Sequence, residues 1–235
     1  MTIPTKILAV DDEPDVTRSI RLTIAVQEPE WTIVEASSGE EGLVLLSQEK
    51  PDLVLLDLRM PGMSGLETLR RIRSFSNIPV IVLTVTNNEL DEVNSLEEGA
   101  DDYITKPFGH LELVAHIKSV LRRVREREPA EEPMYIDGDL KVDFQRRIIH
   151  AGARESSITS TEFALLKILI ENQGQTIPAD ILLQRIWGPN AVDNRNYLKV
   201  YVRRLREKME ENPAAPQRLI SMRGIGYRLE RASPL

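Results

Sequence analysis

The sequence predicts an α/β protein with a doubly wound, five-stranded parallel sheet in its first half and a smaller domain after it. In residues 1–120, short apolar runs alternate with segments whose apolar residues recur at helical spacing. This alternation is typical of a parallel sheet with helices on both faces. Residues 134–235 instead combine short strand-like pieces and turns with three helical segments, and 235 residues suffice for two domains.

The charge and the cysteine count narrow the function. Residues 1–120 carry a net charge of -11, whereas residues 121–235 carry +4. An acidic half joined to a basic half predicts a cation-handling domain tethered to one that binds a polyanion. The absence of cysteine excludes disulfides, thiolate zinc sites and a cysteine nucleophile. No apolar run is long enough for a membrane span and no signal pattern is present, so we expect a cytoplasmic protein without membrane contact.

Five strands and five helices are expected in the first half. The strands are short apolar runs at residues 6–10, 31–36, 53–56, 79–83 and 103–105. The helices follow Pro14, where a proline suits the first turn, and Ser38, a plausible N-cap. Further helices are expected through Leu66, Leu69 and Ile72, around Val93 and Leu96, and from His110.

Polar residues stand where the predicted strands end. Asp11 and Asp12 follow the first strand, Asp57 the third, Thr84 the fourth and Lys106 the fifth. A parallel sheet brings these carboxyl ends to one edge, where ligands bind in open α/β folds. Crowded carboxylates need a hard cation, and Mg2+ accepts a few carboxylates while it keeps several waters. An open carboxylate beside a cation, an ammonium and a hydroxyl predicts a site for a transferring phosphoryl group.

Each of these residues also has an ordinary structural explanation. Taken alone, Asp57 fits a residue that caps the next helix better than it fits a reactive site. Asp11 or Asp12 also fits a helix cap, Lys106 a surface charge and Tyr103 a core residue. The functional interpretation depends on their joint occurrence at successive strand ends.

The first half resembles the receiver domain of bacterial response regulators, a flavodoxin-like (CheY-like) fold. The motifs that carry this resemblance are DDE at 11–13, LLDLRMPGMSG at 55–65, LT at 83–84 and GADDYITKPF at 99–108. The resemblance implies that Asp57 is the phosphoacceptor and that Asp11, Asp12, Asp57 and the backbone carbonyl of Arg59 hold Mg2+. It also implies that Lys106 contacts the phosphoryl oxygens, that Pro107 follows a cis peptide bond, and that Thr84 and Tyr103 form a switch pair.

A charged, proline-containing stretch separates the halves. RRVREREPAEEP at 122–133 has almost no apolar residue, so its first part can extend the preceding helix and the rest is expected to be exposed. A continuous helical spacer is disfavoured by Pro129 and Pro133. The predicted domains are residues 1–125, a linker at 126–133 and a second domain at 134–235.

The second half predicts a small antiparallel sheet over residues 134–158 and helices over 159–173, 179–187 and 194–211. In the third helix, Leu198, Val202, Leu205 and Met209 recur at helical spacing and should face a core. A hairpin through MRGIG follows and presents Arg223 at its tip. A charged helix face is commonly just solvated, but a preceding short helix and a following hairpin favour DNA recognition. The expected DNA-contacting residues are Asn194, Tyr197, Lys199, Tyr201, Arg203, Arg204, Arg206 and Arg223.

This half resembles the winged helix-turn-helix effector domain of the OmpR/PhoB class of response regulators. TSTEFALLKIL, RRLREKM and RGIGYRL carry the resemblance, and WGPNAV and YLKVYVRRLR are similar to KdpE-type regulators of potassium-transport genes. The resemblance implies a transcriptional regulator that a sensor histidine kinase phosphorylates. It further implies binding to tandem promoter half-sites, contact with RNA polymerase, and a homodimer on activation.

The residues for dimerisation match the class unevenly. Asp101, Asp102, Glu112 and Arg123 fit the ion-pair pattern that the resemblance implies for the dimer surface. Glu92, however, stands where Lys or Arg is typical, and His116 stands in place of Arg. Exposed ion pairs contribute little individually, so we expect a weaker or rearranged dimer.

Two other functions remain open at this stage. One is a DNA-binding regulator whose receiver is silent and whose activity does not depend on phosphorylation. The other is a Mg2+-dependent phosphohydrolase of the haloacid-dehalogenase type, which wants a second Asp two residues after the nucleophile. Arg59 occupies that position, which disfavours the enzyme.

Overall fold

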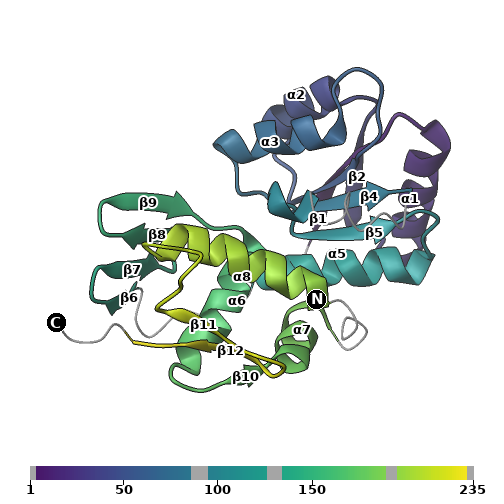
Figure 1. Cartoon of the computed structure of the whole chain (residues 1–235). Coiled ribbons are helices and arrows are strands. Elements are labelled where there is room, and N and C mark those ends of the chain that lie inside the picture. Colours follow the sequence, from purple (N-terminus) through teal and green to yellow (C-terminus); the bar gives the residue numbers. More distant parts are fainter. Residues whose placement is uncertain (1–3, 86–94, 126–133, 189–194, 232–235) are drawn as a thin grey trace. The chain divides into compact units, whose positions relative to one another are not determined.

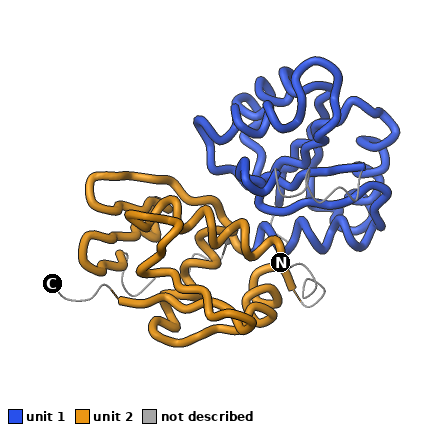
Figure 2. The backbone as a smooth tube through the Cα atoms, in the orientation of Figure 1, with its two compact units in different colours: residues 1–122 blue, residues 123–235 orange. Residues whose placement is uncertain are grey.

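The computed structural model describes residues 4–85, 95–125, 134–188 and 195–231. These residues belong to two compact units, residues 1–122 and residues 123–235 (Figure 2). Each unit has its own sheets and helices (Figure 1). Within the described ranges, no helix has both the length and the apolar character needed to cross a membrane.

The first unit is built on a parallel sheet of five strands. All neighbouring strands pair in parallel, in the order β2-β1-β3-β4-β5. The strands are β1 (Thr5–Val10), β2 (Trp31–Ala36), β3 (Leu53–Asp57), β4 (Val80–Thr84) and β5 (Asp102–Thr105). The chain order reverses at β1 and β3, and in doubly wound folds such a switch point forms the ligand crevice at the carboxyl ends of the strands.

Four helices accompany this sheet in the described residues: α1 (Pro14–Gln27), α2 (Gly39–Glu49), α3 (Gly65–Phe75) and α5 (His110–Arg125). The hydroxyls of Ser38 and Ser64 cap α2 and α3 by accepting hydrogen bonds from backbone N–H groups in the first turn. Of the helix expected around Val93 and Leu96, the described part at residues 95–97 is helical, while Val93 lies outside the described residues.

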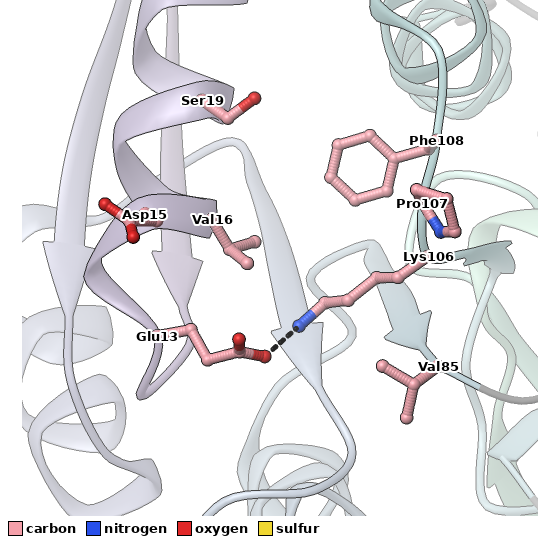
Figure 3. A pocket seen from close by; sticks show the side chains of 8 residues that line it. All are labelled: Glu13, Asp15, Val16, Ser19, Val85, Lys106, Pro107 and Phe108. Carbon is pink, nitrogen blue, oxygen red and sulfur yellow. Dashed lines mark ion pairs between the residues drawn. The ribbon is translucent and has the colours of Figure 1, made fainter.

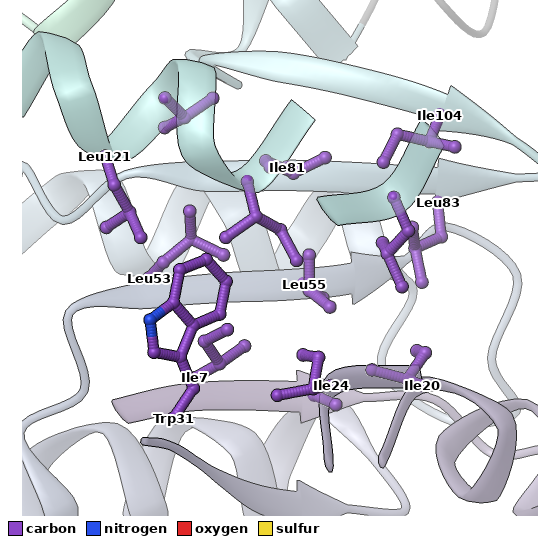
Figure 4. Packing of buried hydrophobic residues seen from close by; sticks show 14 residues of the cluster. Ile7, Ile20, Ile24, Trp31, Leu53, Leu55, Ile81, Leu83, Ile104 and Leu121 are labelled. Carbon is purple, nitrogen blue, oxygen red and sulfur yellow. The ribbon is translucent and has the colours of Figure 1, made fainter. Parts of the chain in front are cut away.

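The core of the first unit fixes the position of the strand ends. Strands β3 and β4 are buried along their whole length, as expected for parallel strands with both faces covered. One face packs α1 and α5 against the sheet, and Figure 4 shows Trp31 of β2 and Ile24 of α1 in this cluster. Burial of this many aliphatic side chains holds the sheet rigidly, so that polar groups at its edge keep fixed positions.

The described residues of the second unit form two antiparallel sheets and three helices. The helices are α6 (Ser160–Glu171), α7 (Ala179–Trp187) and α8 (Arg195–Met209). The four-stranded sheet has the order β6-β7-β8-β9, and the three-stranded sheet the order β10-β12-β11. The strands are β6 (Met134–Asp137), β7 (Leu140–Asp143), β8 (Ile148–Ala151), β9 (Arg154–Ser157), β10 (Ile177–Pro178), β11 (Leu219–Met222) and β12 (Gly226–Leu229).

This architecture confirms the predicted fold class. Three helices followed by the β11–β12 hairpin form the winged helix-turn-helix arrangement, and Leu198, Val202, Leu205 and Met209 of α8 are buried as expected. Helix α6 begins with a capping box, in which Thr159 and Glu162 satisfy each other's backbone N–H groups. The linker expected at residues 126–133 lies outside the described residues.

Candidate functional site

The predicted site residues lie at one edge of the parallel sheet. Asp11 and Asp12 follow β1, Asp57 ends β3, Thr84 ends β4, and Lys106 follows β5. The strand register places Asp57 beside Leu83 and Thr84 beside Thr105, so these ends are adjacent. The structure thus brings together at one edge side chains that are far apart in the sequence.

A single ammonium group bridges two buried carboxylates at this edge. The Nζ atom of Lys106 lies 2.6 Å from Oδ1 of Asp57 and 2.6 Å from Oδ2 of Asp11. It lies 3.7 Å from Oε1 of Glu13, whose side chain is mostly exposed. Asp11 and Asp57 are 2% and 3% exposed, so the ion pairs lie in a region with little solvent screening.

The other oxygen of Asp57 is held by the backbone. Oδ2 accepts a hydrogen bond from the N–H of Arg59 at 2.7 Å. Gly65 supports this end of β3, because a Cβ atom there would lie only 2.0 Å from the carbonyl oxygen of Asp57. In the sequence, Gly65 stands out only as the last residue of the LLDLRMPGMSG motif, and no local pattern indicates this close approach to β3.

Burial and excess negative charge control protonation here. Burial raises the pKa of Asp57, and the nearby charge of Asp11 raises it too, while Lys106 and the N–H of Arg59 act in the opposite direction. For Lys106, burial lowers the pKa, but the hydrogen bonds to Asp11 and Asp57 outweigh it, so the net shift is upward. Lys106 therefore stays charged.

Thr84 contributes a hydroxyl to the same edge. Its side chain is 1% exposed, and its Oγ1 atom has no hydrogen-bond partner among the described residues. A buried hydroxyl without a partner is costly and calls for an explanation, such as a group that binds there in another state. Tyr103 lies on the neighbouring strand, paired in register with Val82, and is half-buried.

The donor set at this edge fits a hard divalent cation. It offers only oxygen ligands, and the charges of Asp11, Asp12 and Asp57 exceed that of Lys106. Within the described ranges, no three His, Cys, Asp or Glu side chains converge closely enough to enclose a metal ion. Carboxylate oxygens in excess of the local positive charge suit Mg2+, which binds through one or two carboxylates and keeps several waters.

A pocket of about 380 Å³ opens beside Lys106 (Figure 3). Residues of α1 and Glu13 just before it line one side of the pocket, and Val85 and the segment that follows β5 line the other. The peptide bond between Lys106 and Pro107 is cis, as the resemblance implied. The lining residues are Glu13, Asp15, Val16, Ser19, Val85, Lys106, Pro107 and Phe108.

Helix α8 presents fewer residues to solvent than the sequence predicted. Lys199 and Arg203 are exposed, but Tyr201 is 0% and Tyr197 7% exposed. Both tyrosines pack against Trp187 of α7, with ring centroids 5.3 and 6.1 Å away. The expectation that they lie on the outer face is therefore wrong, because α8 packs on more than the one side that its aliphatic stripe indicates.

Two arginines of α8 also have partners inside the unit. Arg204 forms an ion pair with buried Glu162 at 3.1 Å, and its side chain is only 11% exposed. Arg206 donates from Nε and Nη2 to the carbonyl of Leu219, at 2.9 and 2.6 Å. The expectation that Arg204 lies on the outer face is wrong, because Glu162 holds its guanidinium group inside the unit. Arg206 is half-buried, because its guanidinium group is bound to the carbonyl of Leu219.

The hairpin tip does carry an exposed Arg223. Gly224 next to it has a φ of +75°, a conformation that favours glycine. At Gly226, a Cβ atom would lie 1.9 Å from the carbonyl oxygen of Ile177, so β12 can approach β10 only with glycine there. Asn194, the remaining predicted DNA-contacting residue, lies outside the described residues.

The residues expected on a dimer surface are largely engaged within the first unit. Asp101 is 0% exposed, and its Oδ2 accepts hydrogen bonds from Arg73 at 3.0 Å and from the N–H of Val80 at 3.1 Å. Asp102 is 1% exposed, and its Oδ2 lies 2.9 Å from Nδ1 of His116. The expectation that both aspartates lie on an exposed surface is wrong in this conformation, because these partners draw the carboxylates inward.

The other dimer-surface candidates are placed differently. Glu112 is exposed at the start of α5, and its Oε2 accepts a hydrogen bond from the N–H of Gly109 at 3.1 Å. Arg123 lies near the end of α5 and is buried. Glu92 lies outside the described residues.

Comparisons with known proteins agree with this architecture. The family model described as "Response regulator receiver domain" matches residues 7–118, and "Transcriptional regulatory protein, C terminal" matches residues 153–229. The chain is 40% identical to the KDP operon transcriptional regulatory protein KdpE of Escherichia coli, over 95% of this chain and 98% of the relative. It is 37% identical to the transcriptional regulatory protein KdpE of Mycobacterium tuberculosis, over 96% of this chain and 99% of the relative.

A solved structure of a response regulator of the OmpR/PhoB class is also similar to this chain. The response regulator DrrB, described as a Thermotoga maritima OmpR/PhoB homologue, matches with a TM-score of 0.51 and 27% identity. The match covers 97% of this chain and all of that one. With a receiver fold, a winged-helix fold and relatives of this identity along nearly its whole length, the chain belongs to the OmpR/PhoB class of two-component response regulators, which are DNA-binding regulators of transcription.

Proposed function

We propose that Asp57 accepts a phosphoryl group from a sensor histidine kinase and that this modification controls DNA binding by the second unit. The observation that carries the proposal is the group of strand ends around Asp57. A buried carboxylate lies 2.6 Å from a charged ammonium, and the adjoining strand ends in a buried hydroxyl without a partner in the described residues. This arrangement provides a nucleophile, a positive charge and a hydrogen-bond donor at one place.

The transfer itself needs little covalent chemistry from the protein. A carboxylate oxygen of Asp57 attacks phosphorus, the P–N bond of the donor phosphohistidine breaks, and the leaving imidazole nitrogen takes up a proton. An acyl phosphate on Asp57 results. Lys106 then balances charge on the phosphoryl oxygens, and the hydroxyl of Thr84 donates to one of them. Tyr103 and Thr84 reorient together and pass the change to the rest of the unit.

The proposed Mg2+ ligands are Asp11, Asp12, Asp57 and the backbone carbonyl of Arg59. When bound, Mg2+ supplies positive charge beside the oxygens of the transferring group. Lys106 already pairs with Asp11 and Asp57, so the remaining negative charge at this edge attracts the cation. The protein itself fixes the nucleophile through the N–H of Arg59 and the packing of Gly65.

We propose that Lys199 and Arg203 of α8 contact DNA in the major groove, while Arg223 at the hairpin tip contacts the backbone or the minor groove. The exposure of these three side chains supports this assignment. Asn194 remains a proposed contact from the sequence. The buried positions of Tyr197, Tyr201 and Arg204 leave them a supporting role.

The wider biology follows from the class. We propose a cytoplasmic protein that pairs as a homodimer on phosphorylation, binds tandem promoter half-sites and contacts RNA polymerase. Since the Escherichia coli relative is named for the KDP operon, we propose potassium-transport genes as the regulated set. Asp101 and Asp102 must lose their present partners before they can form ion pairs across a dimer. We therefore propose that apolar contacts between the two receiver domains stabilise the dimer more than these ion pairs do.

The experiment compares DNA binding with and without phosphorylation. A fluorescein-labelled duplex that the wild-type protein selects from a randomised pool serves as the probe. Wild-type protein and Asp57→Asn are each incubated with Mg2+ in the presence or absence of acetyl phosphate, and then titrated into the probe. We expect acetyl phosphate to tighten binding by wild type and to leave Asp57→Asn unchanged. Equal and tight binding in all four samples would establish the silent receiver instead.

A further inference from the structure

The outer strand of the wing has backbone groups that no other strand satisfies. Strand β11 lies at the edge of the sheet with the order β10-β12-β11, so only its inner side is paired with β12. Outward backbone groups on an edge strand need other partners. At the start of β11, the side chains of Arg206 in the last turn of α8 and of Glu210, directly after α8, supply them.

Leu219, the first residue of β11, is held at both of its backbone groups. Its N–H donates to Oε1 of Glu210 at 2.8 Å. Its carbonyl accepts from Nε and Nη2 of Arg206, at 2.9 and 2.6 Å. Arg206 and Glu210 are four residues apart, so both point from the same side of the helix end toward the strand.

Glu210 binds more of the connection between helix and strand. Its carboxylate also accepts from the N–H of Gln217 and the N–H of Arg218, each at 3.0 Å. The residue is 3% exposed, and a buried carboxylate that accepts several N–H groups makes strong, charge-assisted hydrogen bonds. Arg206 adds a bond from Nη2 to the hydroxyl of Ser221 at 2.9 Å.

We infer that Arg206 and Glu210 are positioning residues that join the wing to the recognition helix α8, so that both meet DNA as one rigid surface. This inference rests on the proposed DNA contacts of Lys199, Arg203 and Arg223. It assigns Arg206 a different role from the DNA contact that the sequence predicted. A wing held in place before binding loses less conformational entropy on the DNA, which raises affinity.

The hairpin has a second attachment, which makes the inference testable without unfolding the unit. Strand β12 pairs with β10, and Gly226 packs directly against the backbone of Ile177. Loss of the bonds from Glu210 should therefore loosen β11 and the hairpin tip while the hairpin itself persists. The helix side of the DNA surface, marked by Lys199, should stay in place.

The test is a pair of double-mutant cycles in the full-length protein, with the selected duplex as probe. In the wild-type background, Arg223→Ala and Lys199→Ala should each weaken binding about tenfold, a usual cost for one DNA contact. In the Glu210→Ala background, Lys199→Ala should weaken DNA binding by the same factor as in wild type. Arg223→Ala should weaken it by less than about twofold, because the effects of two residues that act through one another are not additive. Arg206→Met should reproduce this pattern.

Glu211→Ala is the matched control, because Glu211 is the exposed acidic neighbour of Glu210. It removes the same charge, and in this background Arg223→Ala and Lys199→Ala should each weaken DNA binding as much as they do in wild type. Hydrogen exchange provides a readout without DNA. Amides of residues 217–226 should exchange faster in Glu210→Ala than in wild type, while amides of α6 should be unaffected.

Several results would overturn the inference. A full cost of Arg223→Ala in the Glu210→Ala background would show that the wing tip does not depend on Glu210. Loss of the Lys199→Ala cost as well would mean that α8 itself moved and that the effect is not specific to the wing. If neither Arg223→Ala nor Lys199→Ala weakens binding by wild type, the proposed DNA surface is wrong, and the inference falls with it. Unchanged exchange at 217–226 would contradict it independently.

Discussion

The ammonium of Lys106 lies 2.6 Å from the carboxylate of Asp57, and the same ammonium lies 2.6 Å from Asp11. One positive charge thus serves two buried negative ones. Removing it leaves two uncompensated carboxylates in a region of low dielectric, which is among the costliest changes a core can suffer. The proposed phosphoryl site is therefore also a point on which the stability of the first unit depends.

Lys106→Met tests this dependence. We expect a loss of about 3 kcal/mol in the free energy of unfolding at pH 7, because the methionine fills similar space but leaves the carboxylates unpaired. The loss should shrink at acidic pH, where Asp57, whose pKa is already raised by burial, becomes protonated. Urea unfolding at pH 7 and at lower pH measures both effects.

Lys6→Met is the control for that change. Lys6 pairs with Glu49 at 3.0 Å, but the two side chains are 38% and 40% exposed. An exposed pair contributes under about 1 kcal/mol, so this variant should be close to wild type. Equal destabilisation by the two substitutions would contradict the special position of Lys106.

The pKa of Glu162 in the second unit is shifted in the opposite direction to that of Asp57. Burial alone would raise its pKa, but the charges of Arg204 and Lys208 outweigh burial and lower the pKa below its usual value of 4.5. The folded state then favours the ionised form. Its contribution to stability is present above pH 4.5 and is lost as the pH falls through the lowered value.

Glu162→Gln should therefore lower the free energy of unfolding by about 3 kcal/mol at neutral pH. The difference in unfolding free energy from wild type should narrow below pH 4.5. Urea unfolding of both proteins across this range measures the gap. Glu171→Gln, in a largely exposed pair with Lys167, controls for loss of a surface carboxylate. A gap that stays constant down to the acid limit would refute the assigned role of the charge.

The salt dependence of DNA binding separates surface from buried cations on α8. Each phosphate contact contributes about one unit to the slope of log K against log salt. Lys199→Ala should reduce that slope by about one, since Lys199 is exposed. Arg204→Met should leave the slope unchanged and lower the unfolding free energy, because Arg204 pairs with Glu162 inside the unit. Anisotropy titrations over a series of salt concentrations measure the slopes, and a reduced slope in Arg204→Met would contradict the structure of this pair.

The strand ends of the first unit were predictable from the sequence for a physical reason. Each buried parallel strand is an unbroken apolar run, so the first polar residue after it marks the sheet edge. Asp57 and Thr84 end such runs, and their convergence comes from the parallel topology. The ion pair from Lys106 to Asp11 needs side-chain geometry, which no local pattern contains.

The surface of α8 was less predictable. Periodicity identifies one apolar stripe, here Leu198 to Met209, but does not reveal how many neighbours a helix has. Tyr201 is buried because α7 brings Trp187 against it. Arg204 is drawn inward by Glu162, which lies in the capping box of another helix, α6. Partners from distant segments thus decided which polar residues stayed on the surface.

The partner of Asp101 within the first unit was not predictable for a similar reason. Asp101 has the position expected for an intermolecular ion pair, but Arg73 from α3 reaches it within the unit. The same guanidinium donates to the carbonyl oxygens of Gly99 and Ile78, which places it firmly beside Asp101. An arginine 28 residues away along the chain carried no sequence signal of this pairing.

Intact-protein mass spectrometry after incubation with acetyl phosphate tests the central claim most directly. With Mg2+ present, wild-type protein should gain the mass of one phosphoryl group, and peptide mapping should place it on Asp57. Asp57→Asn, and wild type with EDTA in place of Mg2+, should gain nothing. An equal gain in wild type and Asp57→Asn, or no gain in any sample, would contradict the assignment of Asp57 as the phosphoacceptor.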